Sequence, residues 1–166
     1  MYKIFETERL FVHRYSEKDF DDFFLLNGDD DIMRYIRPAQ NREDSLQFFE
    51  KIIQAYDEQP GLGRWGMRLK ADNSFVGSFA VIPVAFSTDL QLGYALLKTV
   101  RGKGYASEAV MGGIAYMFDQ LKLESIAAIT EIENTASQKV LLRNGFVFEK
   151  KFNEGEKELN LYRLRR

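Results

Sequence analysis

The amino-acid sequence predicts an α/β domain in which a twisted, mixed but mostly antiparallel sheet is flanked by about four helices. Stretches with apolar residues at alternate positions are interspersed with stretches whose apolar residues recur every three or four positions. Three strand-like stretches follow one another in the middle of the chain, which favours antiparallel neighbours. The expected order of elements is therefore β-α-α-β-β-β-α-β-α-β-β.

The first elements are a strand and two helices. Alternating apolar residues predict the strand at residues 9–14. Ser16, with an acid at Asp19 three positions later, has the N-cap pattern of a helix that runs to about Leu26. Apolar residues at helical spacing predict the second helix over residues 42–57.

The middle of the chain has the period of strands. Strands are expected at residues 64–69 and 75–84, and the turn-rich segment 71–74 between them makes the pair a hairpin. A third strand is expected at residues 90–97, after a polar loop at 87–89.

The second half is expected to alternate helices and strands. Apolar residues spaced i, i+3, i+4, i+7 predict a helix over residues 105–121. A strand-length apolar run follows, and then a short helix that an Asn-Gly pair closes. The remaining expected elements are the strand 125–132, the helix 135–143 and two final strands at 146–149 and 158–164.

Length and composition limit the classes of protein that remain. With 166 residues, 45% of them hydrophobic, and no linker or repeat, the chain is expected to form one domain over residues 1–166. A formal net charge of −2 argues against a nucleic-acid partner bound through a bulk positive field. The absence of cysteine excludes disulfides, thiolate metal sites and cysteine nucleophiles, and no metal is expected.

No stretch of the sequence has the apolar run of a signal peptide or of a membrane span. A cytoplasmic location without a membrane partner is therefore expected. A homodimer is left open, because no sequence feature decides the oligomeric state.

One basic, glycine-containing turn carries most of the chemical information. It joins the expected strand 90–97 to the expected helix that follows, so several backbone N–H groups point the same way at a helix N-terminus. That arrangement binds phosphate groups, and the two glycines let a ligand approach the backbone closely. The turn consists of Arg101, Gly102, Lys103, Gly104, Tyr105 and Ala106.

Other interpretations of this turn are weaker. A tight turn without a ligand would need neither paired basic residues nor a small first helical residue. The pattern Gly102-x-Gly104-x-x-Ser107 is one residue short of a dinucleotide fingerprint, and Glu124 lies about 20 residues further on, where an acid would bind ribose. That fingerprint opens a parallel βαβ unit, whereas an antiparallel meander is expected before this turn. A Walker A loop is absent from the sequence.

The pattern Arg101-x-x-Gly104-x-Ala106 resembles the [QR]-x-x-G-x-[GA] signature of the GNAT superfamily of N-acetyltransferases. The surrounding segments resemble one branch of that superfamily, which includes the ribosomal-protein N-terminal (alanine/serine) acetyltransferases. The resemblance covers roughly residues 6–164. The matching segments are 6–10, Trp65 and Gly77 in the hairpin, Gly93-Tyr94, 106–109, 133–137 and Gly145-Phe146.

The resemblance implies that acetyl-CoA is the cosubstrate and that its pyrophosphate lies on the N–H groups of residues 101–106. Strand residues Leu96 and Leu97 would bind the pantetheine arm, and an N–H near Leu96 would stabilise the oxyanion. Their side chains also fit a core strand. In the similar branch, the residue at Asn134 contacts pantetheine and the serine at Ser137 faces the sulfur, where it would protonate the departing thiolate.

Some of these residues also fit purely structural roles. Asn134 and Ser137 at the start of a helix also fit helix capping. Lys139 and Arg143, four residues apart, would reach the adenosine phosphates or form a solvated basic face.

The general base is the least determined residue. A primary amine must lose a proton before it attacks, and Glu131 is the first candidate for the base, ahead of Glu133. Many relatives carry an acid after the Gly-Tyr pair, where this chain has Ala95. Glu108, in the first turn of its helix, is expected to be structural. His13 is expected to lie far from the turn.

The sequence therefore predicts an N-acetyltransferase that transfers acetyl from acetyl-CoA to a primary amine, by direct attack in a ternary complex. The acceptor is either a protein N-terminus or a small-molecule amine. The acidic run Asp29-Asp30-Asp31 would attract a cationic acceptor or form a solvated loop. An acyl-CoA-binding sensor or interaction module without turnover is the alternative, and Ala95 is the residue in its favour.

Overall fold

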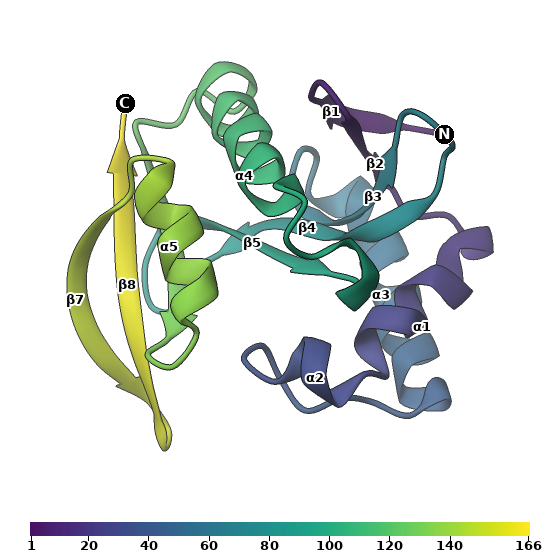
Figure 1. Cartoon of the computed structure of the whole chain (residues 1–166), viewed down its shortest axis with the longest axis horizontal. Coiled ribbons are helices and arrows are strands. Elements are labelled where there is room, and N and C mark those ends of the chain that lie inside the picture. Colours follow the sequence, from purple (N-terminus) through teal and green to yellow (C-terminus); the bar gives the residue numbers. More distant parts are fainter.

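An eight-stranded sheet forms the centre of the molecule in the computed structural model, which describes residues 1–166 (Figure 1). The spatial order is β1-β2-β3-β4-β5-β6-β8-β7. All neighbouring strands are antiparallel except β5 and β6, which run parallel. The strands are β1 (Lys3–Glu6), β2 (Leu10–Arg14), β3 (Gly63–Leu69), β4 (Phe75–Pro83), β5 (Leu90–Leu96), β6 (Ser125–Glu131), β7 (Val147–Glu154) and β8 (Lys157–Arg165).

Five α-helices cover the two faces of the sheet. Helix α4 packs so closely on the sheet that a Cβ added at Gly113 would come within 2.2 Å of the Phe79 ring. Successive side chains of a strand point to opposite faces, so Ser78 and Ala80, which flank Phe79, face α1 and α3 instead. The helices are α1 (Phe20–Asn27), α2 (Asp30–Met33), α3 (Arg42–Glu58), α4 (Tyr105–Ala115) and α5 (Thr135–Arg143).

The predicted fold class is confirmed, and two elements were not predicted. Strand β1 has only four residues, and it exists because it pairs with β2, for example Glu6 with Phe11. Helix α2 also has four residues, and the Asp29 carboxylate caps it by accepting from the N–H groups of Asp31 and Ile32. Neither element is long enough to show a hydrophobic period.

The acidic run at residues 29–31 is not a solvated loop. Besides capping α2, Asp29 forms an ion pair of 2.9 Å with Lys98, and Asp31 forms one of 3.1 Å with the same ammonium group. These contacts tie α2 to the segment that follows β5. Asp29 and Asp31 therefore hold the fold at this point and are already paired with a cation, whereas Asp30 is exposed and forms no ion pair.

Strand β7 is longer than predicted, because it runs from Val147 to Glu154 instead of ending at residue 149. Most of its side chains are exposed, so its later residues show no apolar alternation. Backbone pairing with β8 defines the strand, with Glu154 opposite Lys157 at the tip of the hairpin.

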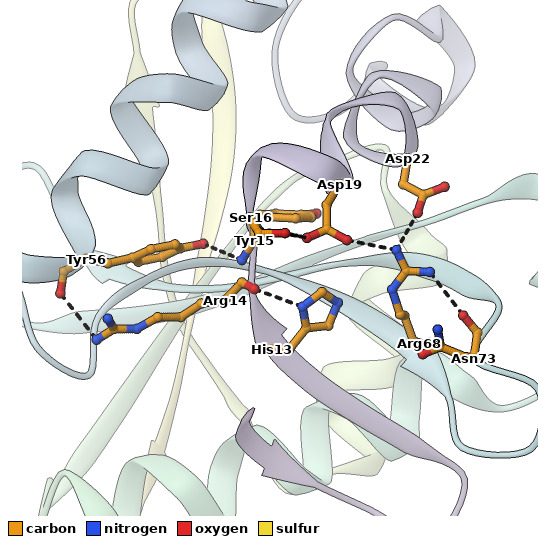
Figure 2. Close-up of polar contacts among 9 residues, drawn as sticks. All are labelled: His13, Arg14, Tyr15, Ser16, Asp19, Asp22, Tyr56, Arg68 and Asn73. Carbon is orange, nitrogen blue, oxygen red and sulfur yellow. Dashed lines mark hydrogen bonds and ion pairs between the residues drawn. The ribbon is translucent and has the colours of Figure 1, made fainter. Parts of the chain in front are cut away.

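A polar network holds α1 and α3 against the sheet (Figure 2). The Arg68 guanidinium of β3 is largely buried and donates to Asp19 at 2.9 Å and to Asp22 at 2.5 Å. Burial acts to raise the pKa of Asp19, but hydrogen bonds from Ser16 and Arg68 outweigh it, and the pKa lies below its ordinary value. Helix α3 is held by Tyr56, whose hydroxyl accepts a hydrogen bond from the Tyr15 N–H at 3.1 Å.

Strands β5 and β6 separate along their length. They pair only where Gln91 lies opposite Ala127, whereas β5 pairs with β4 over its whole length from Leu90 to Leu96. The two strands therefore part toward their carboxyl ends and leave a split in the sheet. No helix of the molecule is both long enough and apolar enough to cross a membrane.

Candidate active site

A cavity of about 490 Å³ lies at the split between β5 and β6. Its size falls in the range of small-molecule sites. Gly93 and Tyr94 line it from β5, Thr130 and Glu131 line it from β6, and Ser137 lines it from α5. The topology thus brings together the strand, the helix start and the acid that the sequence singled out separately.

The backbone of β5 presents an N–H group to this split. The Leu97 N–H donates to the Val76 carbonyl at 3.0 Å. In an antiparallel ladder, successive residues direct their backbone groups to opposite sides of the strand. The Leu96 N–H therefore points away from β4 toward the split, while the Leu96 side chain is buried in the core. The two roles expected for Leu96, oxyanion binding by its N–H and core packing by its side chain, are therefore compatible. The Leu97 N–H, in contrast, already bonds to Val76 within the sheet.

Strand β4 approaches β5 unusually closely behind this point. A Cβ added at Gly77 would lie 2.1 Å from the Ala95 carbonyl oxygen and 3.1 Å from Leu96 Cα. These are backbone atoms, which cannot move aside as a flexible side chain can. Gly77 therefore allows the position that β5 adopts at Leu96.

Replacing Gly77 with alanine should displace β5 and lower turnover by about tenfold to hundredfold, because displacements of an ångström at a reacting centre have effects of that size. Turnover and thermal unfolding would be measured together. Gly113→Ala is the control, since its Cβ would crowd the Phe79 ring instead of the β5 backbone. If both variants lost turnover only in proportion to stability, the close approach at Gly77 would have no role in positioning Leu96.

The turn before α4 presents unpaired backbone donors. None of the N–H groups from Gly102 to Ser107 donates to another group of the chain. Gly102 and Gly104 have φ values of 75° and 83°, in the left-handed region, and Gly104 is the N-cap of α4. The Arg101 N–H instead donates to the Lys98 carbonyl at 3.3 Å. The donor array therefore begins one residue later than the sequence suggests.

Glu108 holds this turn in place, which confirms its predicted structural role. Its carboxylate accepts from the Arg9 N–H at 2.7 Å, from Arg9 Nε at 2.6 Å and from the Thr7 hydroxyl at 2.5 Å. Arg9 also donates to the Lys103 carbonyl at 3.1 Å. Burial acts to raise the pKa of Glu108, but these hydrogen bonds outweigh it and the pKa is lowered.

Three side chains meet where the split reaches α5. Asn134 is the N-cap of α5, and its Oδ1 accepts from the Ser137 N–H at 3.2 Å, so the capping role is confirmed. The Tyr94 hydroxyl donates to Ser137 Oγ at 3.4 Å. Burial raises the pKa of Tyr94, although the contact with Ser137 acts in the opposite direction, so the phenol keeps its proton at neutral pH.

No sequence pattern singled out Tyr94 as a chemical group. The available signal was its position two residues before Leu96, which places both side chains on the same face of β5. The contact with Ser137 depends on how α5 packs over β5, and only the tertiary structure supplies it.

The two candidate bases lie in different surroundings. Glu131, at the end of β6, lines the cavity, and one of its carboxylate oxygens forms an ion pair with Lys157 at 2.5 Å. Glu133 is exposed and does not line the cavity. Ala95 also lines it and brings no acid.

The remaining candidates lie away from the cavity. Lys139 and Arg143 are exposed on α5 and form no ion pair. His13 is buried, and its Nδ1 bonds to the Arg14 carbonyl oxygen at 2.8 Å. Burial lowers the pKa of His13, even though that hydrogen bond acts to raise it. Nowhere do three or more histidine, aspartate or glutamate side chains gather in a way that could hold a metal ion.

Comparison with known proteins assigns the family. The model of the acetyltransferase (GNAT) domain matches residues 9–147. The uncharacterized N-acetyltransferase YoaA of Bacillus subtilis is 26% identical over 149 residues, which are 88% of this chain and 84% of that protein. A GNAT-family acetyltransferase from Bacillus anthracis has a structure with a TM-score of 0.85 at 25% identity, covering 97% of both chains.

The ribosomal-protein acetyltransferase RimL, solved in complex with coenzyme A, shares the fold. Its TM-score is 0.81 at 15% identity, and the match covers 98% of this chain and 97% of that chain. The expected resemblance is thus confirmed at the level of family and fold. The chain belongs to the GNAT family of acetyltransferases.

Proposed function

We propose that this enzyme transfers the acetyl group of acetyl-CoA to a primary amine by direct attack in a ternary complex. One observation carries the proposal: the unpaired N–H groups of residues 102–107 and the Leu96 N–H lie at successive parts of the same strand, turn and helix. The first group suits a pyrophosphate, and the second suits the oxygen of a thioester.

The cosubstrate would lie along the split. Its pyrophosphate would accept hydrogen bonds from the backbone of Gly102, Lys103 and Gly104 and from the first turn of α4. The pantetheine arm would then run between β5 and β6, where these strands no longer pair with one another. Asn134 would contact this arm, and Lys139 would lie toward the adenosine phosphates.

In the chemical step the amine nitrogen attacks the thioester carbon. The carbonyl oxygen gains negative charge, and the Leu96 N–H stabilises that charge. As the tetrahedral intermediate collapses, its nitrogen loses a proton to water, the carbon–sulfur bond breaks and the sulfur leaves as a thiolate. Ser137 donates a proton to this thiolate, and Tyr94, whose hydroxyl lies 3.4 Å from Ser137 Oγ, donates its proton to Ser137. Water then returns a proton to Tyr94.

The acceptor must arrive as a neutral amine. Glu131 is the acid of the cavity that is best placed to take its proton, directly or through one water molecule. Lys157 holds one carboxylate oxygen of Glu131 and leaves the other free. The cavity therefore contains a carboxylate even though this chain has Ala95 where many relatives have an acid.

Calorimetry and thermal unfolding with acetyl-CoA test the binding step. We expect stoichiometric binding, weaker binding of dephospho and desulfo analogues, and about 2.7 kcal/mol of stabilisation at a hundredfold excess over Kd. Thiol release with a panel of amines then tests turnover. No heat and no thermal shift at saturating acetyl-CoA would contradict the proposal. Binding without thiol release for any amine would instead favour a sensor module.

A further inference from the structure

Two arginines of the chain are shielded from solvent without a carboxylate partner. Five arginines are partly buried, and three of them, Arg14, Arg68 and Arg163, form ion pairs with aspartate side chains. Arg37 and Arg64 have no carboxylate within 4.0 Å. Shielded cations without an anion are costly and therefore uncommon.

These two arginines line the cavity of the active site. Arg37 follows α2 and Arg64 lies on β3, and both guanidinium groups stack on the ring of Phe48, at 4.5 Å and 5.5 Å from its centroid. The Arg64 side chain makes no hydrogen bond within the chain. Arg37 donates from Nη2 to the neutral Asn27 Oδ1, and its buried Nε has no partner.

The surroundings of both groups disfavour an isolated positive charge. Burial lowers the pKa of Arg37 to about 10, with a smaller contribution from repulsion by Arg64. Burial also lowers the pKa of Arg64. Stacking on Phe48 compensates only part of the lost hydration. An anion that entered the cavity would restore the missing interactions, because guanidinium groups bind carboxylate and phosphate with paired hydrogen bonds.

The sheet offers an open path from this pair to the reacting centre. Arg64 lies opposite Ala80 on β4, and Ala80 lies opposite Gly93 on β5, at the edge of the split. Directly opposite residues share a face of the sheet, and Ala80 and Gly93 are small. A Cβ added at Gly93 would meet no atom within 4 Å. A ligand held by Arg64 therefore extends over small residues toward the split.

We infer that the acceptor is a small amine that also carries an oxyanion, either a carboxylate or a phosphate. Arg37 and Arg64 bind the oxyanion, and the amine end reaches the thioester at the split. The inference rests on the proposed acetyl transfer and narrows its acceptor class. Lys157 and Glu131 of the same cavity pair with one another, whereas Arg37 and Arg64 have no carboxylate partner and would repel the further ammonium groups of a polyamine. An amino acid or a phosphorylated amino alcohol carries the charge that matches the two arginines.

The test compares acceptors that differ only in the anion. Thiol release from acetyl-CoA is measured for the standard L-amino acids against their amides, and for O-phosphoethanolamine against ethanolamine. At least one anionic acceptor should exceed its neutral counterpart in kcat/KM by about tenfold to hundredfold, the usual range for a charged hydrogen bond. The pair that shows this preference distinguishes carboxylate from phosphate.

Variants then assign the preference to the arginines. Arg64→Gln should remove most of the preference for the anionic acceptor of the pair. The kcat/KM for the neutral acceptor and the affinity for acetyl-CoA should stay unchanged. Arg64→Lys should keep part of the preference. Arg34→Gln is the matched control, because Arg34 is exposed and also has no carboxylate partner. Arg37→Gln is a second variant and should also reduce the preference for the anionic acceptor. Its affinity for acetyl-CoA shows whether the protein is folded.

The outcomes separate this inference from the proposed function. Equal or faster turnover of neutral amines, or an equal loss for both members of a pair in Arg64→Gln, would overturn the inference while acetyl transfer stands. Binding of acetyl-CoA without turnover of any anionic acceptor would also overturn it. Failure of the wild-type protein to bind acetyl-CoA would instead contradict the proposed function.

Discussion

Replacing Gly104 with valine should reduce acetyl-CoA affinity by about a hundredfold or more, while the circular dichroism spectrum stays close to that of the wild type. Gly104 has a φ of 83° at the N-cap of α4, a conformation that a β-branched residue rarely adopts. Valine would strain the turn or move its N–H groups, and its methyl groups would occupy the space of the pyrophosphate. Isothermal titration calorimetry measures the change directly.

Gly155→Val is a matched control for this variant. Gly155 also has a positive φ, of 60°, and a Cβ at this position would meet no atom within 4 Å. It lies in the turn between β7 and β8, away from the turn that precedes α4. The control should lose stability and retain acetyl-CoA affinity. A folded Gly104→Val protein with wild-type affinity would show that the pyrophosphate lies elsewhere.

Ser137→Ala should lower turnover by about a hundredfold or more and leave acetyl-CoA affinity nearly unchanged, because proton transfer to a leaving group contributes on that scale. Ser137 is the third residue of α5, so alanine at this position is compatible with the helix. The measurement is turnover at a saturating amine, supported by single-turnover kinetics in case product release limits the wild type.

Two further variants separate the roles around Ser137. Asn134→Ala should weaken both acetyl-CoA binding and the start of α5, because Asn134 Oδ1 accepts from the Ser137 N–H. Tyr94→Phe removes only the hydroxyl that donates to Ser137 Oγ, so a smaller loss of turnover is expected than for Ser137→Ala. Full turnover in Ser137→Ala would assign thiolate protonation to Tyr94 or to solvent.

Local patterns determined much of the fold in advance. The segments around α3, α4 and β3 to β6 are long enough to show a clear hydrophobic period, and they lie where that period places them. The glycine-containing turn at residues 101–106 and the cap at Asn134 could also be identified, because they depend on residues near one another in sequence. Glu108 could be assigned a structural role from its place in the first turn of a helix, although its partners Thr7 and Arg9 could not. Short elements such as β1 and α2 carry too few residues for such a pattern.

The tertiary structure alone decided which side chains meet around the cavity. The contact of Tyr94 with Ser137 joins β5 to α5, and the ion pair of Glu131 with Lys157 joins β6 to β8. Arg37 and Arg64 become a pair only because both stack on Phe48. Hydrophobic periodicity predicts which face of a helix or strand is buried. It does not predict which side chains of other elements contact that face. The family could be predicted from local sequence motifs, whereas the fold was needed to place Arg37 and Arg64 together in the cavity.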